Sequence, residues 1–150
     1  MTSLTTVSRR DALCLTAAAL ALAPGLARAD AAAVEAELRK LYGDKKPGSG
    51  KIRLDVPQIA ENGLVVPISV EVESPMTEKD HVKTVHVFAD GNPLPGIASF
   101  RFTPACGRAA ASTRMRLAQT QNIVAIAEMA DGSLFSTMSE VKVTIGGCGG

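Results

Sequence analysis

The sequence has no tryptophan and few aromatic residues of any kind, with one tyrosine and four phenylalanines among 150 residues. Proteins that bind single-stranded nucleic acid stack bases on aromatic side chains, and this chain has few to offer. Its formal net charge of +1 argues against nucleic acid or an anionic membrane surface as the main partner. There is also no C-x-x-C pair, zinc-ligand spacing, phosphate-binding loop or nucleophile elbow. We therefore expect neither a cofactor nor a catalytic residue.

Metal-binding side chains are few as well. The two histidines, His81 and His86, are five residues apart on an expected strand, so their side chains point to opposite faces and do not form a ready metal pair. Three methionines, Met115, Met129 and Met138, fall on expected strand faces. Filling the core is a better interpretation of these methionines than binding copper. We expect no metal site.

Several arginines lie close together in the second half of the sequence. A basic patch near one sheet face, which would attract an oxyanion or an acidic partner, is one interpretation, and an ordinary solvated face is the other. The residues concerned are Arg101, Arg108, Arg114 and Arg116.

The N-terminal segment is typical of an export signal. Arg9 and Arg10 precede an apolar stretch at residues 15–26, and an A-x-A cleavage signal follows at residues 27–29. The paired arginines indicate the twin-arginine route. The apolar stretch is shorter than the ~20 residues that a membrane-spanning helix needs, so we expect no membrane anchor. Removing residues 1–29 would leave a chain of 150 − 29 = 121 residues in the periplasm, enough for one domain.

The remaining chain shows one helical pattern and then alternating strand patterns. Val34, Leu38 and Leu41 recur at helical spacing in residues 30–42, whereas Leu64 begins an alternating apolar face that runs to residue 72. Residues 122–129 are apolar on both faces, which indicates a central strand. The expected strands are residues 52–56, 64–72, 82–88, 98–102, 111–117, 122–129, 133–138 and 141–145. This pattern predicts a mainly β domain over residues 30–145, an immunoglobulin-like antiparallel β-sandwich with a short N-terminal helix and a flexible C-terminal arm.

The expected arm, residues 146–150, contains a single cysteine, Cys148, with Gly146 and Gly147 before it and Gly149 and Gly150 after it. Glycine lacks a Cβ and loses more backbone entropy when ordered than any other residue, so this run predicts a tether. Fully extended, it carries the sulfur roughly 10 Å beyond the last strand. No neighbouring cation in the sequence would activate the thiol. We therefore expect its reactivity to come from the active site of another protein.

Three segments resemble the SoxY family, the sulfur carriers of the bacterial Sox thiosulfate-oxidising system. They are the terminal residues 143–150, VTIGGCGG, together with residues 114–121 and 131–133. The resemblance implies that Cys148 holds thiosulfate-derived sulfur covalently and that the chain is a carrier, not an enzyme. It also implies a heterodimer with SoxZ. The transient partners would be the haem protein SoxAX, the dimanganese hydrolase SoxB, and SoxCD, which oxidises the remaining sulfane sulfur.

Two other classes of function remain open from the residues. In the first, Cys106 and Cys148 form a disulfide in a structural or binding β-sandwich. In the second, Cys148 and the methionines serve a periplasmic metal or redox chaperone. Under the carrier interpretation no role is assigned to Cys106, which is then a buried thiol or a second bridge former.

Overall fold

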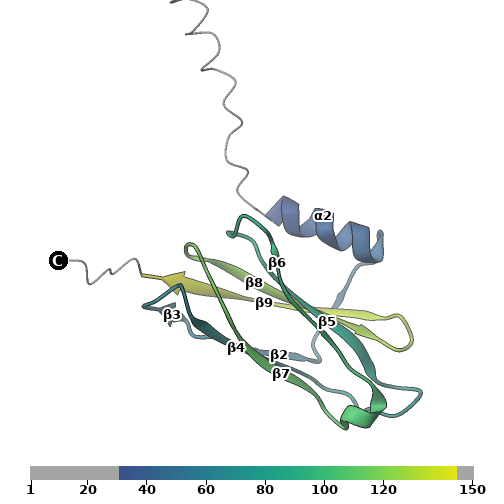
Figure 1. Ribbon diagram of the computed structural model, residues 1–150. Coiled ribbons are helices and arrows are strands. Elements are labelled where there is room, and N and C mark those ends of the chain that lie inside the picture. The colour runs from purple at the N-terminus through teal and green to yellow at the C-terminus, as the bar shows by residue number, and fades with distance from the viewer. Residues whose placement is uncertain (1–30, 145–150) are drawn as a thin grey trace, which may run out of the picture.

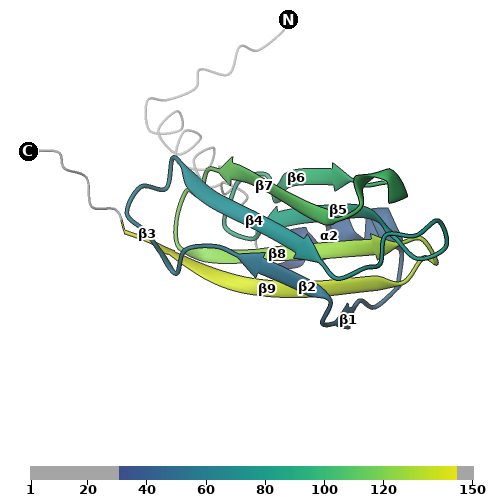
Figure 2. The same cartoon turned by 90° about the horizontal axis from the view of Figure 1, so that it is seen from below.

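The computed structural model describes residues 31–144 of the chain. The expected signal peptide, residues 1–29, and the expected arm, residues 146–150, lie outside the described residues. Within the described part, nine strands form two facing sheets (Figures 1 and 2). The elements are α2 (Ala31–Tyr42), β1 (Gly48–Ser49), β2 (Ile52–Asp55), β3 (Ile59–Ala60), β4 (Val66–Val72), β5 (Val82–Ala89), β6 (Gly96–Arg101), η2 (Pro104–Cys106), β7 (Ala109–Met115), β8 (Gln121–Met129) and β9 (Leu134–Val143).

The strand order is that of an immunoglobulin-like sandwich. One sheet has the order β2-β4-β7, and the other has β1-β9-β8-β5-β6, with β3 also paired to β9. The chain therefore changes sheet at each step from β1 to β5, and again between β6 and β7 and between β7 and β8. Such crossings join the two layers through one shared core. The expected mainly β sandwich with a leading helix is confirmed.

The core between the sheets follows the alternation that the sequence predicts. In β4, Val66, Ile68, Val70 and Val72 are buried. They pack against inward-facing residues of β5 and β8 in two adjoining clusters. Burying each valine or isoleucine contributes about 1.5–3 kcal/mol relative to leaving it exposed. This alternating face therefore fixes the register of the sheets, because a slip of one residue would move all four side chains out to water.

Helix α2 covers the outer face of the six-stranded sheet, on the side away from β2, β4 and β7 (Figures 1 and 2). Val34 of the helix packs with Phe88 of β5 and Ile126 of β8 in a third cluster. This contact explains why β8 is apolar on both faces, as expected for a central strand. No helix within residues 31–144 is long and apolar enough to span a membrane.

Four details differ from the sequence-based expectation. Residues 133–138 and 141–145 were expected as two strands, but β9 is continuous over Leu134–Val143, because β8 pairs with it without interruption. Strands β1 and β3 were not expected, and both pair parallel with β9. Strand β4 begins at Val66, so Leu64 is 60% exposed instead of lying on the core face.

Met138 is 65% exposed and not core filling, because it lies opposite Val124 on the outer face of the sheet. Met115 and Met129 are buried as expected.

Candidate functional site

The expected site residues Cys148, Gly146, Gly147, Gly149 and Gly150 lie outside the described residues. The structure does describe the place from which they follow, the end of β9 at Val143 and Thr144. We call Val143 and Thr144, with the residues that bind them, the arm base. It lies at the end of the sandwich where β3 meets β9 (Figure 1).

Hydrogen bonds hold the arm base on both sides. On the β3 side, the amide of Lys142 donates to the carbonyl of Gln58 at 2.9 Å, and the amide of Thr144 donates to the carbonyl of Ala60 at 3.1 Å. On the β8 side, the amide of Val143 donates to Thr120 Oγ1 at 3.0 Å. Three successive backbone amides are thus satisfied, so the strand is fixed up to its last described residue.

Gly63 provides the space for a close approach at the arm base. Its carbonyl accepts a hydrogen bond of 2.8 Å from the amide of Leu117. A Cβ at this position would lie 2.4 Å from the carbonyl oxygen of Leu117 and 2.9 Å from Val143 Cγ1. The residue therefore has to be glycine for the loop of residues 61–65 to rest against both the end of β9 and the loop that precedes β8.

A buried polar network orders the neighbouring loops. Gln121 is 5% exposed, the single buried polar residue among the described ones. Its Oε1 accepts from the amide of Gly91 at 2.8 Å, and its Nε2 donates to Asn92 Oδ1 and to the carbonyl of Gln119, each at 3.0 Å. Asn92 in turn donates to the carbonyl of Arg116 at 2.8 Å. A satisfied buried network of this kind makes the connected loops rigid.

A groove of about 310 Å³ lies beside the arm base. Its lining contains one cation and one anion, so it offers no strongly charged binding site. The lining residues are Gln58, Ile59, Ser139, Glu140 and Lys142.

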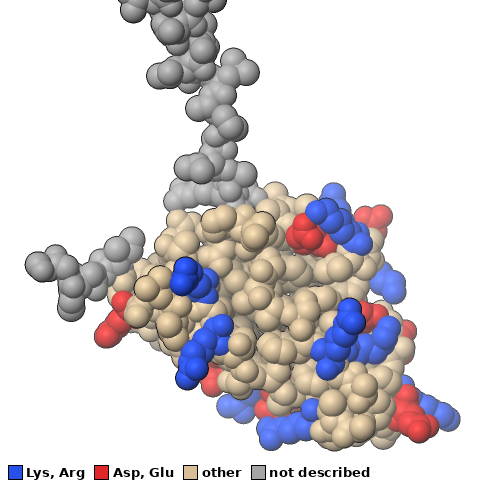
Figure 3. All heavy atoms as spheres, viewed as in Figure 1, with Lys and Arg blue, Asp and Glu red and all other residues tan. Residues whose placement is uncertain are grey.

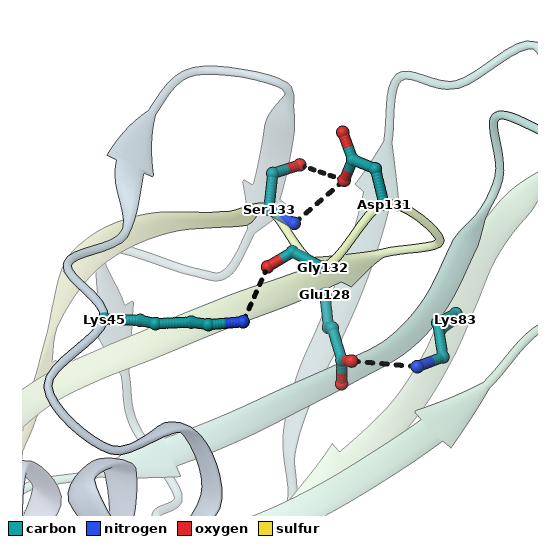
Figure 4. Close-up of polar contacts among 6 residues, drawn as sticks. All are labelled: Lys45, Lys83, Glu128, Asp131, Gly132 and Ser133. Carbon is teal, nitrogen blue, oxygen red and sulfur yellow. Dashed lines mark hydrogen bonds and ion pairs between the residues drawn. The ribbon is translucent and has the colours of Figure 1, made fainter.

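The ionisable groups with displaced pKa values lie away from the arm base. Burial, with a smaller contribution from Glu128, raises the pKa of Tyr42 to about 12, and burial lowers the pKa of His86. Hydrogen bonds from Ser133 lower the pKa of Asp131 in the β8–β9 turn, where Figure 4 shows the hydroxyl and the amide of Ser133 directed at one carboxylate oxygen. Figure 4 also shows the ion pair of Lys83 with Glu128, at 3.0 Å. None of these groups belongs to a residue that binds Val143 or Thr144, so they offer the arm base no general acid or base.

The histidines and arginines do not converge. His81 Nδ1 lies 3.1 Å from the carbonyl of Thr77, and His86 Nδ1 lies 2.7 Å from Ser99 Oγ. Among residues 31–144 no group of three or more histidine, cysteine or acidic side chains is placed to hold a metal ion. The four arginines do not all lie on one sheet, since Arg114 is on β7 and Arg101 is on β6. Arg101 lies on β6 opposite Thr84, whereas Arg108 precedes β7 of the other sheet and forms an ion pair with Glu71 at 2.6 Å.

Cys106 lies at the opposite end of the sandwich from the arm base. It is exposed on η2, five residues after Arg101 at the end of β6, so it is not a buried thiol. The strand registers place Arg101 level with the start of β9, because Arg101 pairs with Thr84, Thr84 with Glu128, and Glu128 with Leu134. The start and end of this ten-residue strand are about 30 Å apart, at ~3.3 Å per residue.

This separation excludes a disulfide between Cys106 and Cys148 of the same chain. Four residues lead from Thr144 to Cys148, and they span at most about 14 Å when fully extended. A disulfide also requires Cα atoms within about 7 Å of each other. The internally bridged sandwich is therefore ruled out by the length of the domain.

The family model for SoxY, described as sulfur oxidation protein SoxY, matches residues 38–148. The chain belongs to the SoxY family. The structure of the sulfur carrier protein SoxY from Chlorobium limicola f. thiosulfatophilum is similar, with 31% sequence identity and a TM-score of 0.65 over 77% of this chain and 100% of that chain. The described domain is thus the SoxY fold, and the chain is a protein of the Sox sulfur-oxidation system. None of the curated proteins matches it.

Other solved structures share the fold alone. A superoxide reductase (neelaredoxin) from Ignicoccus hospitalis has 15% identity and a TM-score of 0.57, over 63% of this chain and 81% of that chain. A putative superoxide reductase from Thermotoga maritima has 19% identity and a TM-score of 0.55, over 66% and 88%. The same sandwich therefore occurs in proteins named for a different activity, and function follows from the residues the fold presents.

The sequence predicts Cys148, which lies outside the described residues, and gives no indication of the residues that form the arm base. Thr120 and Gly63 gave no periodic signal, because both lie in loops. Gln121 begins β8 and resembles any polar residue at a strand end. The one available signal was Gly63 between Asn62 and Leu64, which is compatible with a turn and does not reveal the close contact with Leu117.

Proposed function

We propose that this chain is a periplasmic sulfur carrier that holds thiosulfate-derived intermediates covalently on Cys148 and presents them to the Sox enzymes. The family match supports this most directly, because it extends beyond the described domain and ends on Cys148 itself. The arm base supports it too, since an ordered strand end is a suitable attachment for a short arm that has to reach into other proteins. The proposed role is that of a covalent substrate carrier and not of an enzyme.

The chemistry of loading is an oxidative coupling. The thiol of Cys148 and thiosulfate form an S–S bond, giving Cys–S–S–SO₃⁻, a proton and two electrons, which the haem protein SoxAX accepts. SoxB then hydrolyses the bond to the terminal sulfonate. Water supplies the fourth oxygen of sulfate, two protons are released, and the persulfide anion Cys–S–S⁻ remains on Cys148. SoxCD oxidises this sulfane sulfur. Because each step takes place in a partner, the carrier needs no acid, base or metal of its own.

Two further parts of the proposal concern location and assembly. Residues 1–29 direct the export of the chain through the twin-arginine route. Replacing Arg9 and Arg10 with lysine would block this export. SoxZ forms the heterodimer in which the carrier works. Co-expression and size-exclusion chromatography of the two chains, which should elute together in equimolar amounts, test this assembly.

The decisive experiment compares two cysteine variants by intact-mass measurement and by thiosulfate-dependent electron transfer with purified Sox enzymes. Cys148→Ser should fold normally, lose all sulfur adducts and abolish electron transfer. Cys106→Ser is the matched control and should retain both, since Cys106 lies at the far end of the domain. Turnover retained in Cys148→Ser would exclude the carrier function.

The structure disfavours the metal or redox chaperone. Met115 and Met129 are buried in the core and unavailable as ligands, and Met138 faces outward on the side of the sheet that carries α2. Metal content after dialysis should be the same in the native protein and in Cys148→Ser. A loss of bound metal in the variant would favour the chaperone instead.

A further inference from the structure

Large exposed apolar side chains are concentrated at the arm end of the domain. Ile59, Leu64, Val65 and Leu94 are 58%, 60%, 53% and 78% exposed. We call these four residues the arm-end apolar surface. Among the described residues two further large apolar side chains are exposed, Leu41 on α2 at 49% and Met138 on β9 at 65%. Single exposed apolar residues are normal, whereas a group at one end of a domain indicates a contact surface.

Three of the four residues lie next to the arm base. Ile59 pairs with Lys142 in the short parallel contact of β3 with β9. Leu64 and Val65 follow Gly63, which lies against Leu117 and the side chain of Val143. The amide of Leu64 donates to Asn62 Oδ1 at 2.9 Å, so this amide is satisfied although the loop is exposed.

Leu94 lies at the same end of the domain, in the β5–β6 loop. Asn92, two residues earlier, bonds to Arg116, Ala118 and Gln121, and this ties the loop to the segment that precedes β8. Pro93 and Pro95 flank Leu94 and restrict its backbone further. The apolar side chains therefore sit on loops ordered in advance, which lowers the entropy cost of binding a partner.

Because the arm is short, every enzyme that acts on Cys148 has to approach the arm-end apolar surface. Cys148 lies four residues beyond Thr144, so its backbone extends at most about 14 Å from the arm base. An enzyme that acts on its sulfur has to approach the arm base within that distance. A typical interface covers about 800 Å² of each protein, a disc roughly 30 Å across. An interface of that size centred on the arm base would include the loops of residues 59–65 and 90–95.

We propose that the arm-end apolar surface is the docking surface for the enzymes that take up the arm, and that it binds an apolar rim around the mouth of their active sites. This inference rests on the proposed carrier function. Charged residues are depleted at the centre of protein interfaces, and all four residues of the arm-end apolar surface are uncharged. The charged residues beside them include Glu61, Lys142 and Arg116. On the face seen in Figure 3, the charged side chains are scattered among uncharged residues. One apolar surface serves several enzymes because it depends on no partner-specific pattern of charges.

Steady-state kinetics with the carrier as the varied substrate test this docking surface. The purified haem enzyme SoxAX, thiosulfate and an electron acceptor are supplied, and the SoxY–SoxZ complex is titrated. The variants are Leu64→Ser with Val65→Ser, and separately Leu94→Ser. The matched controls are Met138→Ser and Leu41→Ser, which remove exposed apolar side chains away from the arm base.

We expect the arm-end variants to raise KM for the carrier about tenfold with kcat within twofold of the wild type, because a few residues dominate most interfaces. The controls should leave KM unchanged, and alkylation of Cys148 by iodoacetamide should proceed at the same rate in all variants. The KM of the wild type should not rise with salt, since apolar contacts are not screened.

Several results would overturn the proposal. Unchanged KM in the arm-end variants, or an equal rise in Met138→Ser, would exclude this surface as the docking site. A change in oligomeric state with unchanged KM would assign it to a second copy of the chain, and faster alkylation would assign it to the arm itself. In these cases the wild type still turns over, so the carrier function stands. A wild type that accepts no sulfur would refute the carrier function and the docking surface together.

Discussion

Replacing Gly63 with alanine tests whether the arm base depends on one close contact. The new Cβ would lie 2.4 Å from the carbonyl oxygen of Leu117 and 2.9 Å from Val143 Cγ1. The first of these atoms belongs to the backbone, so no side-chain rotation relieves the clash. Either the loop of residues 61–65 moves away or the loop that precedes β8 does, and both movements break the 2.8 Å hydrogen bond between Leu117 and Gly63.

The expected cost is the sum of two effects. Forcing an extra carbon into a filled site costs typically ~1–3 kcal/mol. Losing the hydrogen bond between Leu117 and Gly63 costs about 1 kcal/mol more. We therefore expect the free energy of unfolding to fall by about 2–4 kcal/mol. In a domain of this size, the melting temperature should fall by roughly 10 °C.

Thermal and urea unfolding followed by circular dichroism measure this effect, with Gly96→Ala as the matched control. Gly96 also lies in the sandwich, but a Cβ there meets no atom within 4 Å, so the control should be neutral or slightly stabilising. Amide hydrogen exchange at Thr144 should accelerate in Gly63→Ala and not in Gly96→Ala. A Gly63→Ala protein whose free energy of unfolding lies within about 0.5 kcal/mol of the wild type, the range of an ordinary surface substitution, would refute this account of the arm base.

Three other predictions concern single side chains. Thr120→Val should cost about 1–2 kcal/mol in urea unfolding because it leaves the amide of Val143 without its partner, whereas Thr120→Ser should restore most of the loss. Burial lowers the pKa of His86, so the unfolded chain binds a proton more readily than the folded one. Stability should therefore fall as the pH drops below about 6.5, and His86→Gln should flatten that part of the pH profile. Within residues 31–144 the buried hydroxyl of Tyr42 has no hydrogen-bond partner, so Tyr42→Phe should raise the free energy of unfolding by up to about 1 kcal/mol; a destabilised variant would indicate a partner for the hydroxyl.

The sequence predicts those parts of the fold that depend on periodic burial. Strand β4 shows its apolar face as a strict alternation from Val66 to Val72. Strand β8 shows apolar residues on both faces because one face meets the three-stranded sheet and the other meets Val34 and its helix. Apolar residues alternate along a strand because burying one of its faces lowers the free energy of the folded chain. The residue pattern alone therefore predicts these elements.

The arm base could not be predicted in the same way, because it is made of contacts between loops far apart in the chain. Ser139 and Glu140 interrupt the apolar alternation of β9 and suggest a break, yet both pair with β8. The contact of Gly63 with Leu117, and that of Thr120 with Val143, join segments whose spacing in sequence carries no signal. Single-sequence patterns report which face of an element is buried, and they do not report which loop meets which.

The distance from Cys106 to the arm base also determines how the proposed carrier behaves when oxidised. Because the arm base and Cys106 lie at opposite ends of the sandwich, which is at least as long as the ten-residue strand β9 of about 30 Å, a bridge to Cys148 can form only between chains. Bridging between chains depends on concentration, whereas an internal bridge would form at any dilution. In air-oxidised protein we therefore expect the share of disulfide-linked dimers to increase with protein concentration. At low concentration the chains should stay monomeric and keep both thiols titratable. Loss of both thiols in a monomer of unchanged mass, apart from two hydrogens, would mean that Cys106 and the arm do meet and that the strand registers do not hold them apart.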